Sequence, residues 1–165
     1  MRIRITKLTD LRHRFEVLRE RGVAEAAELE TRSLLLHDFL HYAAEEAAGL
    51  QHGFYGRLAA GDSLASLSHP ESGPMADAPP PREDARQPSL ATIEPVVGAL
   101  TSFAKGDLSI ESALERFELA ASSGALERPS WVDAAFLERV RARLGQLTGH
   151  WKALRHGESL ELTWP

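Results

Sequence analysis

Apolar and polar residues alternate in short segments at both ends of the chain, and this period of two is typical of strands with one buried face. The alternation covers residues 2–5, about 12–19 and 159–164, and a weaker match over 23–29 follows a predicted turn at 20–22. A C-terminal strand is not stable alone, so we expect it to pair with an N-terminal strand. Both ends of the chain should therefore meet in one small antiparallel sheet.

Between these strands, apolar residues recur every three or four positions, which predicts amphipathic helices. The repeat covers about 32–50, 93–103, 110–120 and 130–154, and a short helical turn is expected at 54–58. The fold class is therefore predicted to be α+β, with a small antiparallel sheet of N-terminal strands plus a C-terminal strand packed against about four helices.

Residues 61–89 differ in composition from the rest of the chain. Six of the nine prolines lie here among serine, glycine and acidic residues, and the apolar repeat is absent. Such a segment buries too little apolar surface to offset the entropy it would lose on ordering. We therefore predict a single domain spanning residues 1–165, interrupted by a disordered Pro-rich loop at about 61–89.

Composition and charge narrow the classes of protein to consider. The chain has 165 residues, no cysteine and a net charge of −5. The absence of cysteine excludes disulfides, thiolate metal sites and cysteine nucleophiles. No apolar run reaches the ~18 residues needed to span a bilayer, and an acidic chain is poorly suited to bind a phosphate backbone. We expect a soluble cytoplasmic protein that binds neither membranes nor nucleic acids.

The predicted helix at about 32–50 carries the residues of greatest chemical interest, His37, His41 and Glu45. Residues four apart lie on the same side of a helix, about 6 Å apart, so both imidazoles could reach one metal ion. Glu45 lies about 12 Å along the axis from His37, too far to share a mononuclear site with both histidines. We expect it to orient His41 instead, as a hydrogen-bond acceptor behind the metal.

The residues His37-Asp38-Phe39-Leu40-His41 resemble the HExxH helix of zinc peptidases. The resemblance covers five residues, and Asp38 stands where that family has its general-base glutamate, which makes Asp38 the candidate catalytic residue. One methylene fewer moves its carboxylate by about 1 Å, enough to compromise proton transfer to a metal-bound water. A third metal ligand must come from elsewhere, and the candidates are Asp10, Glu30, His52, Glu94 and Glu118.

Two interpretations of this helix remain open. In one, the histidines and Glu45 form a polar, solvent-exposed flank whose pairs add a few tenths of a kcal/mol each. Because no complete catalytic constellation can be assembled, the leading expectation is then a small accessory or regulatory protein that binds a protein partner or self-associates and needs no cofactor. The alternative is a domain that binds a divalent metal such as zinc through His37 and His41. If the metal is catalytic, this domain would be a metal-dependent hydrolase.

Overall fold

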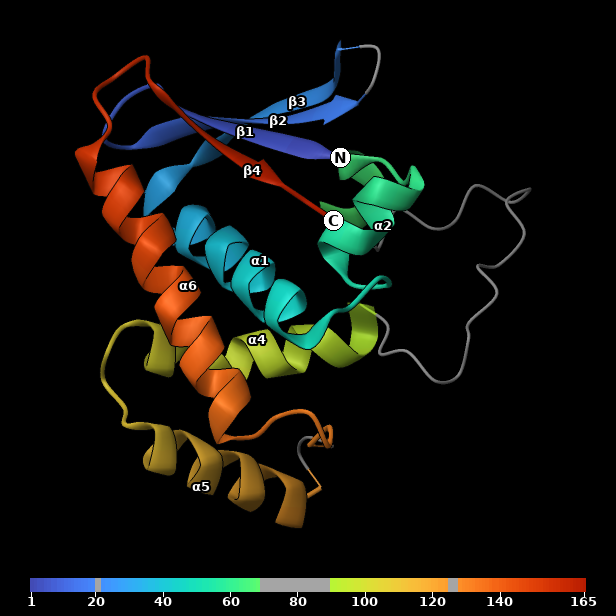
Figure 1. The fold of residues 1–165 in the computed structure, drawn as a ribbon, viewed down its shortest axis with the longest axis vertical. Coiled ribbons are helices and arrows are strands. Elements are labelled where there is room, and N and C mark those ends of the chain that lie inside the picture. The colour runs from blue at the N-terminus through green and yellow to red at the C-terminus, as the bar shows by residue number, and fades with distance from the viewer. Residues whose placement is uncertain (20–21, 69–89, 125–127) are drawn as a thin grey trace.

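A four-stranded antiparallel sheet forms one layer of the protein in the computed structural model, which describes residues 1–19, 22–68, 90–124 and 128–165. The strands are β1 (Arg2–Lys7), β2 (Arg12–Arg19), β3 (Gly22–Glu30) and β4 (Ser159–Thr163). Their order across the sheet is β3-β2-β1-β4 (Figure 1). The α+β class and the pairing of the C-terminal strand with an N-terminal one are therefore confirmed.

The alternation of residue types decides which face of the sheet is buried. Ile3 pairs with Val17 of β2 on one side and with Leu162 of β4 on the other, and all three side chains are buried. Ile5 pairs with Phe15 and Leu160 in the same way. Neighbours in sequence point to opposite faces of a strand, so the polar residues between them face solvent.

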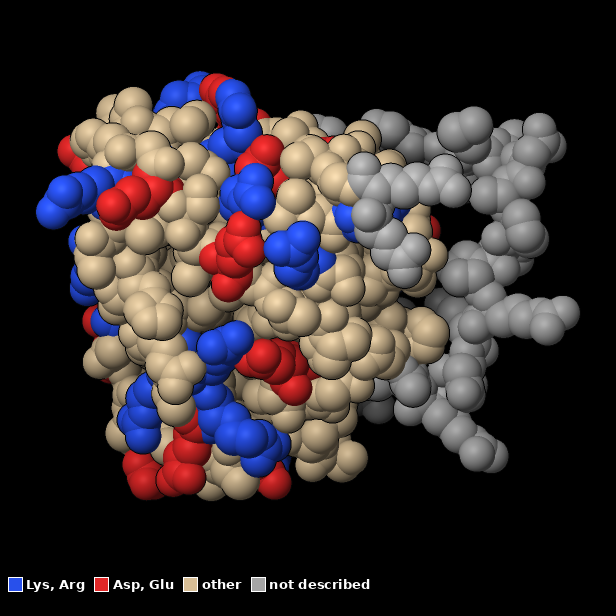
Figure 2. Space-filling view, turned by 45° about the horizontal axis from the view of Figure 1, so that its top comes forward, with Lys and Arg blue, Asp and Glu red and all other residues tan. Residues whose placement is uncertain are grey.

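Opposite charges are paired on the outer face of the sheet. Arg4 lies 2.9 Å from the carboxylate of Glu161, and Arg14 lies 2.9 Å from that of Glu28. Figure 2 shows basic and acidic side chains interspersed over one face of the molecule. Exposed pairs of this kind add about 0–1 kcal/mol each, so they prevent a one-sign surface more than they stabilise the fold.

Helices cover the inner face of the sheet in layers (Figure 1). A π-helical turn, η1 (Thr31–Leu35), leads into α1 (Leu36–Ala48), and α1 packs against α6, α4 and α2. The remaining helices are α2 (Phe54–Ala60), α3 (Leu64–Ser68), α4 (Leu90–Ala104), α5 (Ile110–Ser122) and α6 (Ala134–Ala153). Helix α1 thus lies between the sheet and α4.

The segment between α2 and α4 is the one that the sequence predicts to be a disordered loop. Residues 64–68, inside the predicted loop, form the short helix α3, which adds to the four helices expected. Residues 61–63 of that predicted loop are also described, and residues 69–89 lie outside the described residues. Within the described part of the chain, no helix is both long enough and apolar enough to cross a membrane.

Candidate metal site

The central position of α1 buries residues that an outer helix would expose. His41 is 3% exposed and Glu45 is 0% exposed, because α2 and α4 cover the side of α1 on which they lie. His37, one turn earlier, is partly exposed. The interpretation of this side as a solvent-exposed flank is therefore wrong for His41 and Glu45. It failed because the width of the apolar stripe on α1 does not reveal that other helices pack over the neighbouring polar positions.

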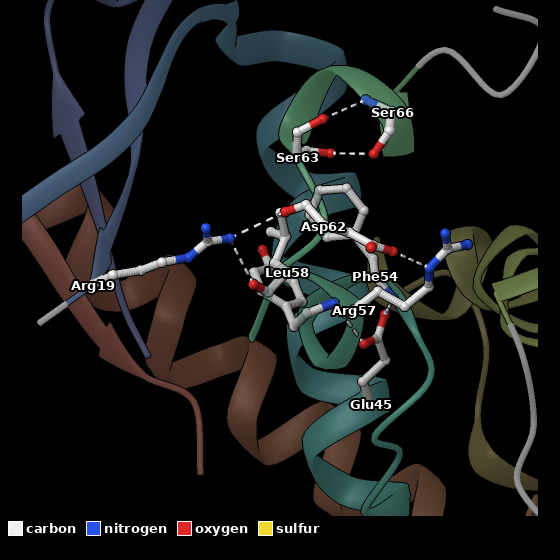
Figure 3. Close-up of polar contacts among 9 residues, drawn as sticks. Arg19, Glu45, Phe54, Arg57, Leu58, Asp62, Ser63 and Ser66 are labelled. Atoms are coloured by element: carbon white, nitrogen blue, oxygen red, sulfur yellow. Dashed lines mark hydrogen bonds and ion pairs between the residues drawn. The ribbon is translucent and has the colours of Figure 1, made fainter. Parts of the chain in front are cut away.

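The carboxylate of Glu45 reaches the start of α2, where it accepts two backbone hydrogen bonds (Figure 3), and it also contacts His41. Its Oε1 accepts from the backbone N–H of Phe54 at 2.9 Å and contacts Nδ1 of His41 at 3.1 Å. Its Oε2 accepts from the backbone N–H of Tyr55, also at 2.9 Å. The first N–H groups of a helix have no partner within the helix, so a buried carboxylate is well accommodated there.

The residue before α2 leaves room for this carboxylate. A Cβ atom on Gly53 would lie 2.4 Å from the carboxyl carbon of Glu45, far closer than two such atoms can approach. The backbone of Gly53 is extended, with φ −75°, so the glycine is required here by space and not by conformation. Glycine at this position therefore allows Glu45 to reach the α2 amides and His41 together.

This arrangement determines which nitrogen of His41 is free. Both oxygens of Glu45 already accept backbone N–H bonds, so the contact with His41 is a hydrogen bond when Nδ1 of the imidazole carries the proton and donates it. The other nitrogen, Nε2, then points away from α2 toward α4. It lies 3.3 Å from Oε1 of Glu94 but does not meet the geometry of a hydrogen bond, and it is buried. A buried nitrogen without a well-directed partner is unusual in a folded protein.

His37, His41 and Glu94 come together at this point. Each offers one ligand atom, and these atoms lie within 4.8 Å of one another, so the group could hold a metal ion. The His37 and His41 rings are 4.6 Å apart between centroids. In a tetrahedral site with bonds of about 2.0–2.1 Å, ligand atoms lie roughly 3.3 Å apart. The 3.3 Å between His41 Nε2 and Glu94 Oε1 already matches that separation.

The charges of the group shift its pKa values in opposite directions. Burial acts to lower the pKa of His41, but hydrogen bonding to Glu45 and the negative charge of Glu94 outweigh it and raise the pKa to about 9. Burial, and then the positive charge of His41, lower the pKa of His37. Interaction with His41 lowers the pKa of Glu94 in spite of its partial burial. Without metal, a protonated His41 would therefore form an ion pair with Glu94 across the contact of α1 with α4.

Asp38, the candidate catalytic residue, faces a different neighbour. Its Oδ2 is buried and lies 3.8 Å from Nε2 of His13, a fully buried residue of β2. The other nitrogen of His13 contacts the hydroxyl of Thr31 at 3.2 Å. Asp38 is thus directed toward the sheet, whereas His41 is directed toward α4, and Asp38 is not among the three grouped ligands.

The structure separates the candidates for a third ligand. Asp10 pairs with His156 at 3.1 Å in the exposed turn between β1 and β2. Glu30 accepts hydrogen bonds from the first N–H groups of η1, and Glu118 of α5 pairs with Arg128. Only Glu94 of the five lies in the group found among the described residues. Nothing in the sequence distinguishes it, because its approach to α1 depends on the packing of α4.

Sequence reasoning did not anticipate the part played by the start of α2. Backbone N–H groups carry no signal in the identity of their residues, so neither Phe54 nor Tyr55 indicates this contact in the sequence. A glycine directly before a helix, close in sequence to a buried acidic residue, is the one clue that the chain offers.

Comparison with known proteins finds no matching family model, no similar curated protein and no similar solved structure, so the function must be inferred from the site itself.

Proposed function

We propose that this protein is a divalent-metal-binding domain in which His37, His41 and Glu94 are the ligands. The observation that carries the proposal is the convergence of their three ligand atoms within 4.8 Å of one another. The alignment of His41 adds to it, because a ligating imidazole needs its second nitrogen hydrogen-bonded to an acceptor. Glu45 is that acceptor, at 3.1 Å.

The ligand set favours zinc or a neighbouring transition metal. Two imidazole nitrogens and one carboxylate oxygen suit Zn²⁺, Co²⁺ and Fe²⁺, whereas Ca²⁺ and Mg²⁺ prefer sites made wholly of oxygen. Zinc stands high in the general order of affinity, and it needs no particular geometry from its d electrons. We therefore propose zinc as the physiological ion.

The metal would replace the proton that links α1 to α4. In the metal-free protein the positive charge on His41 neutralises Glu94, and a bound ion would supply positive charge at the same place. Metal binding adds stability to the folded state because the unfolded chain has no preformed site. Binding to a protein partner, the leading expectation from the sequence, stays a prediction beside this proposal.

The test is the metal content of the full-length protein, purified without an affinity tag and analysed by plasma mass spectrometry. We expect close to one equivalent of zinc in the parent and little in His37→Ala and Glu94→Gln. Matched controls are His150→Ala and Glu115→Gln, which change an exposed histidine on α6 and an exposed glutamate on α5.

Glu94→Gln is the most informative variant. The Glu94 side chain is 47% exposed, so its replacement should leave the fold intact, whereas replacement of the buried His41 could unfold the protein. Equal zinc content in Glu94→Gln and Glu115→Gln would rule out Glu94 as a ligand. Failure of the parent to bind added Zn²⁺, Co²⁺ or Fe²⁺ by calorimetry would overturn the proposal as a whole.

A further inference from the structure

We infer that the ion held by His37, His41 and Glu94 keeps a coordination position open to solvent and binds a small oxygen-donor anion there. This inference rests on the proposed function, and it deepens it by naming the class of ligand. A site of this kind can bring a carboxylate, hydroxamate or similar group of a substrate onto the metal, which a site closed by protein ligands cannot do.

The first support is the unequal exposure of the three ligands. His41 is 3% exposed and lies on the protein side, whereas the side chain of Glu94 is 47% exposed and His37 is partly exposed. An ion in contact with all three therefore has protein on one side and solvent on the other. Among the described residues, the exposed parts of Glu94 and His37 mark the side from which water or a solute would reach the ion.

The second support is the number of ligands. The part of the chain that the structure describes contributes three donors to this group. Structural zinc sites have four protein ligands, whereas catalytic sites have three and leave the remaining position to water or substrate. Cysteine, the ligand that most often closes a structural zinc site, does not occur in the chain.

The third support is charge. A divalent ion with two neutral imidazoles and one carboxylate carries a net charge of about +1, which favours an anion over a neutral ligand. Glu45 does not remove this preference, because its own charge faces the two N–H groups at the start of α2. The net positive charge of the ion with its three ligands therefore favours an anion at the open position.

The fourth support is the rigidity of the buried side. His41 is fixed by Glu45, and Glu45 is fixed by the backbone of Phe54 and Tyr55, both in α2. A metal held on such a support can exchange a ligand on its open side without loss of its protein ligands. This separates a ligand-exchanging site from one that releases the ion when a competing anion arrives.

The experiment uses the full-length protein loaded with one equivalent of Co²⁺, whose visible absorption reports the ligands and geometry of the ion. Acetohydroxamate is added as the anionic oxygen-donor probe. Acetamide, a neutral molecule of similar size, is the matched control. We expect acetohydroxamate to change the absorption bands in a saturable way, acetamide at the same concentration to leave them unchanged, and cobalt to stay with the protein after desalting.

Each other outcome contradicts a defined part of the reasoning. Stoichiometric Co²⁺ whose spectrum does not respond to acetohydroxamate means a closed coordination sphere and overturns this inference alone. Loss of cobalt from the protein on addition of acetohydroxamate also overturns it, because the anion then competes with the protein ligands instead of joining them. If Co²⁺ does not bind, or binds equally to Glu94→Gln, the proposed function itself fails.

Discussion

Replacement of Glu45 by glutamine tests the support behind the site without changing its volume. The side chain is fully buried, and it accepts from His41, Phe54 and Tyr55. A glutamine carbonyl in the place of Oε1 can keep the first two bonds. Its NH₂ group then faces the N–H of Tyr55, so that two donors meet and neither is satisfied.

The cost can be estimated from these contacts. A buried polar group left without a partner costs about 1–3 kcal/mol, and loss of one member of a buried charged pair costs about 3–5 kcal/mol. His41 retains Glu94 as a second negative neighbour, so the loss is incomplete. We expect Glu45→Gln to lower the free energy of unfolding of the metal-free protein by about 2–4 kcal/mol at pH 7. Metal affinity should fall about 10–100-fold.

The next residue in the sequence provides the control. Glu46 pairs with Arg143 at 2.7 Å, with about a third of each side chain exposed, so Glu46→Gln should cost less than about 1 kcal/mol. Urea unfolding followed by tryptophan fluorescence measures both variants, and Trp164, which stacks on Tyr55 at 5.5 Å, reports the region directly. Equal stability and equal zinc affinity in the two variants would refute the role assigned to Glu45.

Three further predictions concern the same group. The pKa of His41, raised to about 9 from 6.5, means that its contribution to the stability of the metal-free protein is complete below pH 6.5 and is lost as the pH rises through 9. The free energy of unfolding should fall by about 3 kcal/mol between pH 6 and pH 9.5, measured by urea unfolding with chelator present. A free energy of unfolding that does not change with pH, or that changes equally in His41→Gln, would contradict this prediction. Because a ligating imidazole must give up this proton, zinc binding near pH 7.5 should release about one proton per ion. Calorimetry in two buffers of different ionisation enthalpy measures this release. Equal heats of binding in both buffers would exclude His41 as a ligand. Gly53→Ala should displace the carboxylate of Glu45 and destabilise the protein by about 1–3 kcal/mol. The control is Gly149→Ala on α6, where a Cβ atom meets no neighbour, and this variant should be more stable by about 0.5–1 kcal/mol. Thermal melts that show the same shift in melting temperature for both variants would contradict the contact between Gly53 and Glu45.

Features that depend on neighbours in sequence could be predicted from the chain alone. The alternation around Ile3 and Ile5, and again around Leu160 and Leu162, specified strands with one apolar face at each end. A strand with one apolar face needs both a partner and a cover, so the joining of the termini followed. The spacing of His37 and His41 likewise placed two imidazoles on one side of a helix, because helical geometry is local.

Only the tertiary structure decided what surrounds those imidazoles. The burial of His41 and the approach of Glu94 depend on how α4 packs against α1, and helices pack through their apolar side chains, which constrain polar neighbours only indirectly. The anchoring of Glu45 depends on backbone N–H groups at the start of α2, which every residue except proline possesses. The sequence by itself thus determined the strands, the main helices and the pair of histidines, because these follow from local periodicity. The third ligand, the buried carboxylate and the raised pKa of His41 were decided by contacts between distant segments, which local periodicity does not encode.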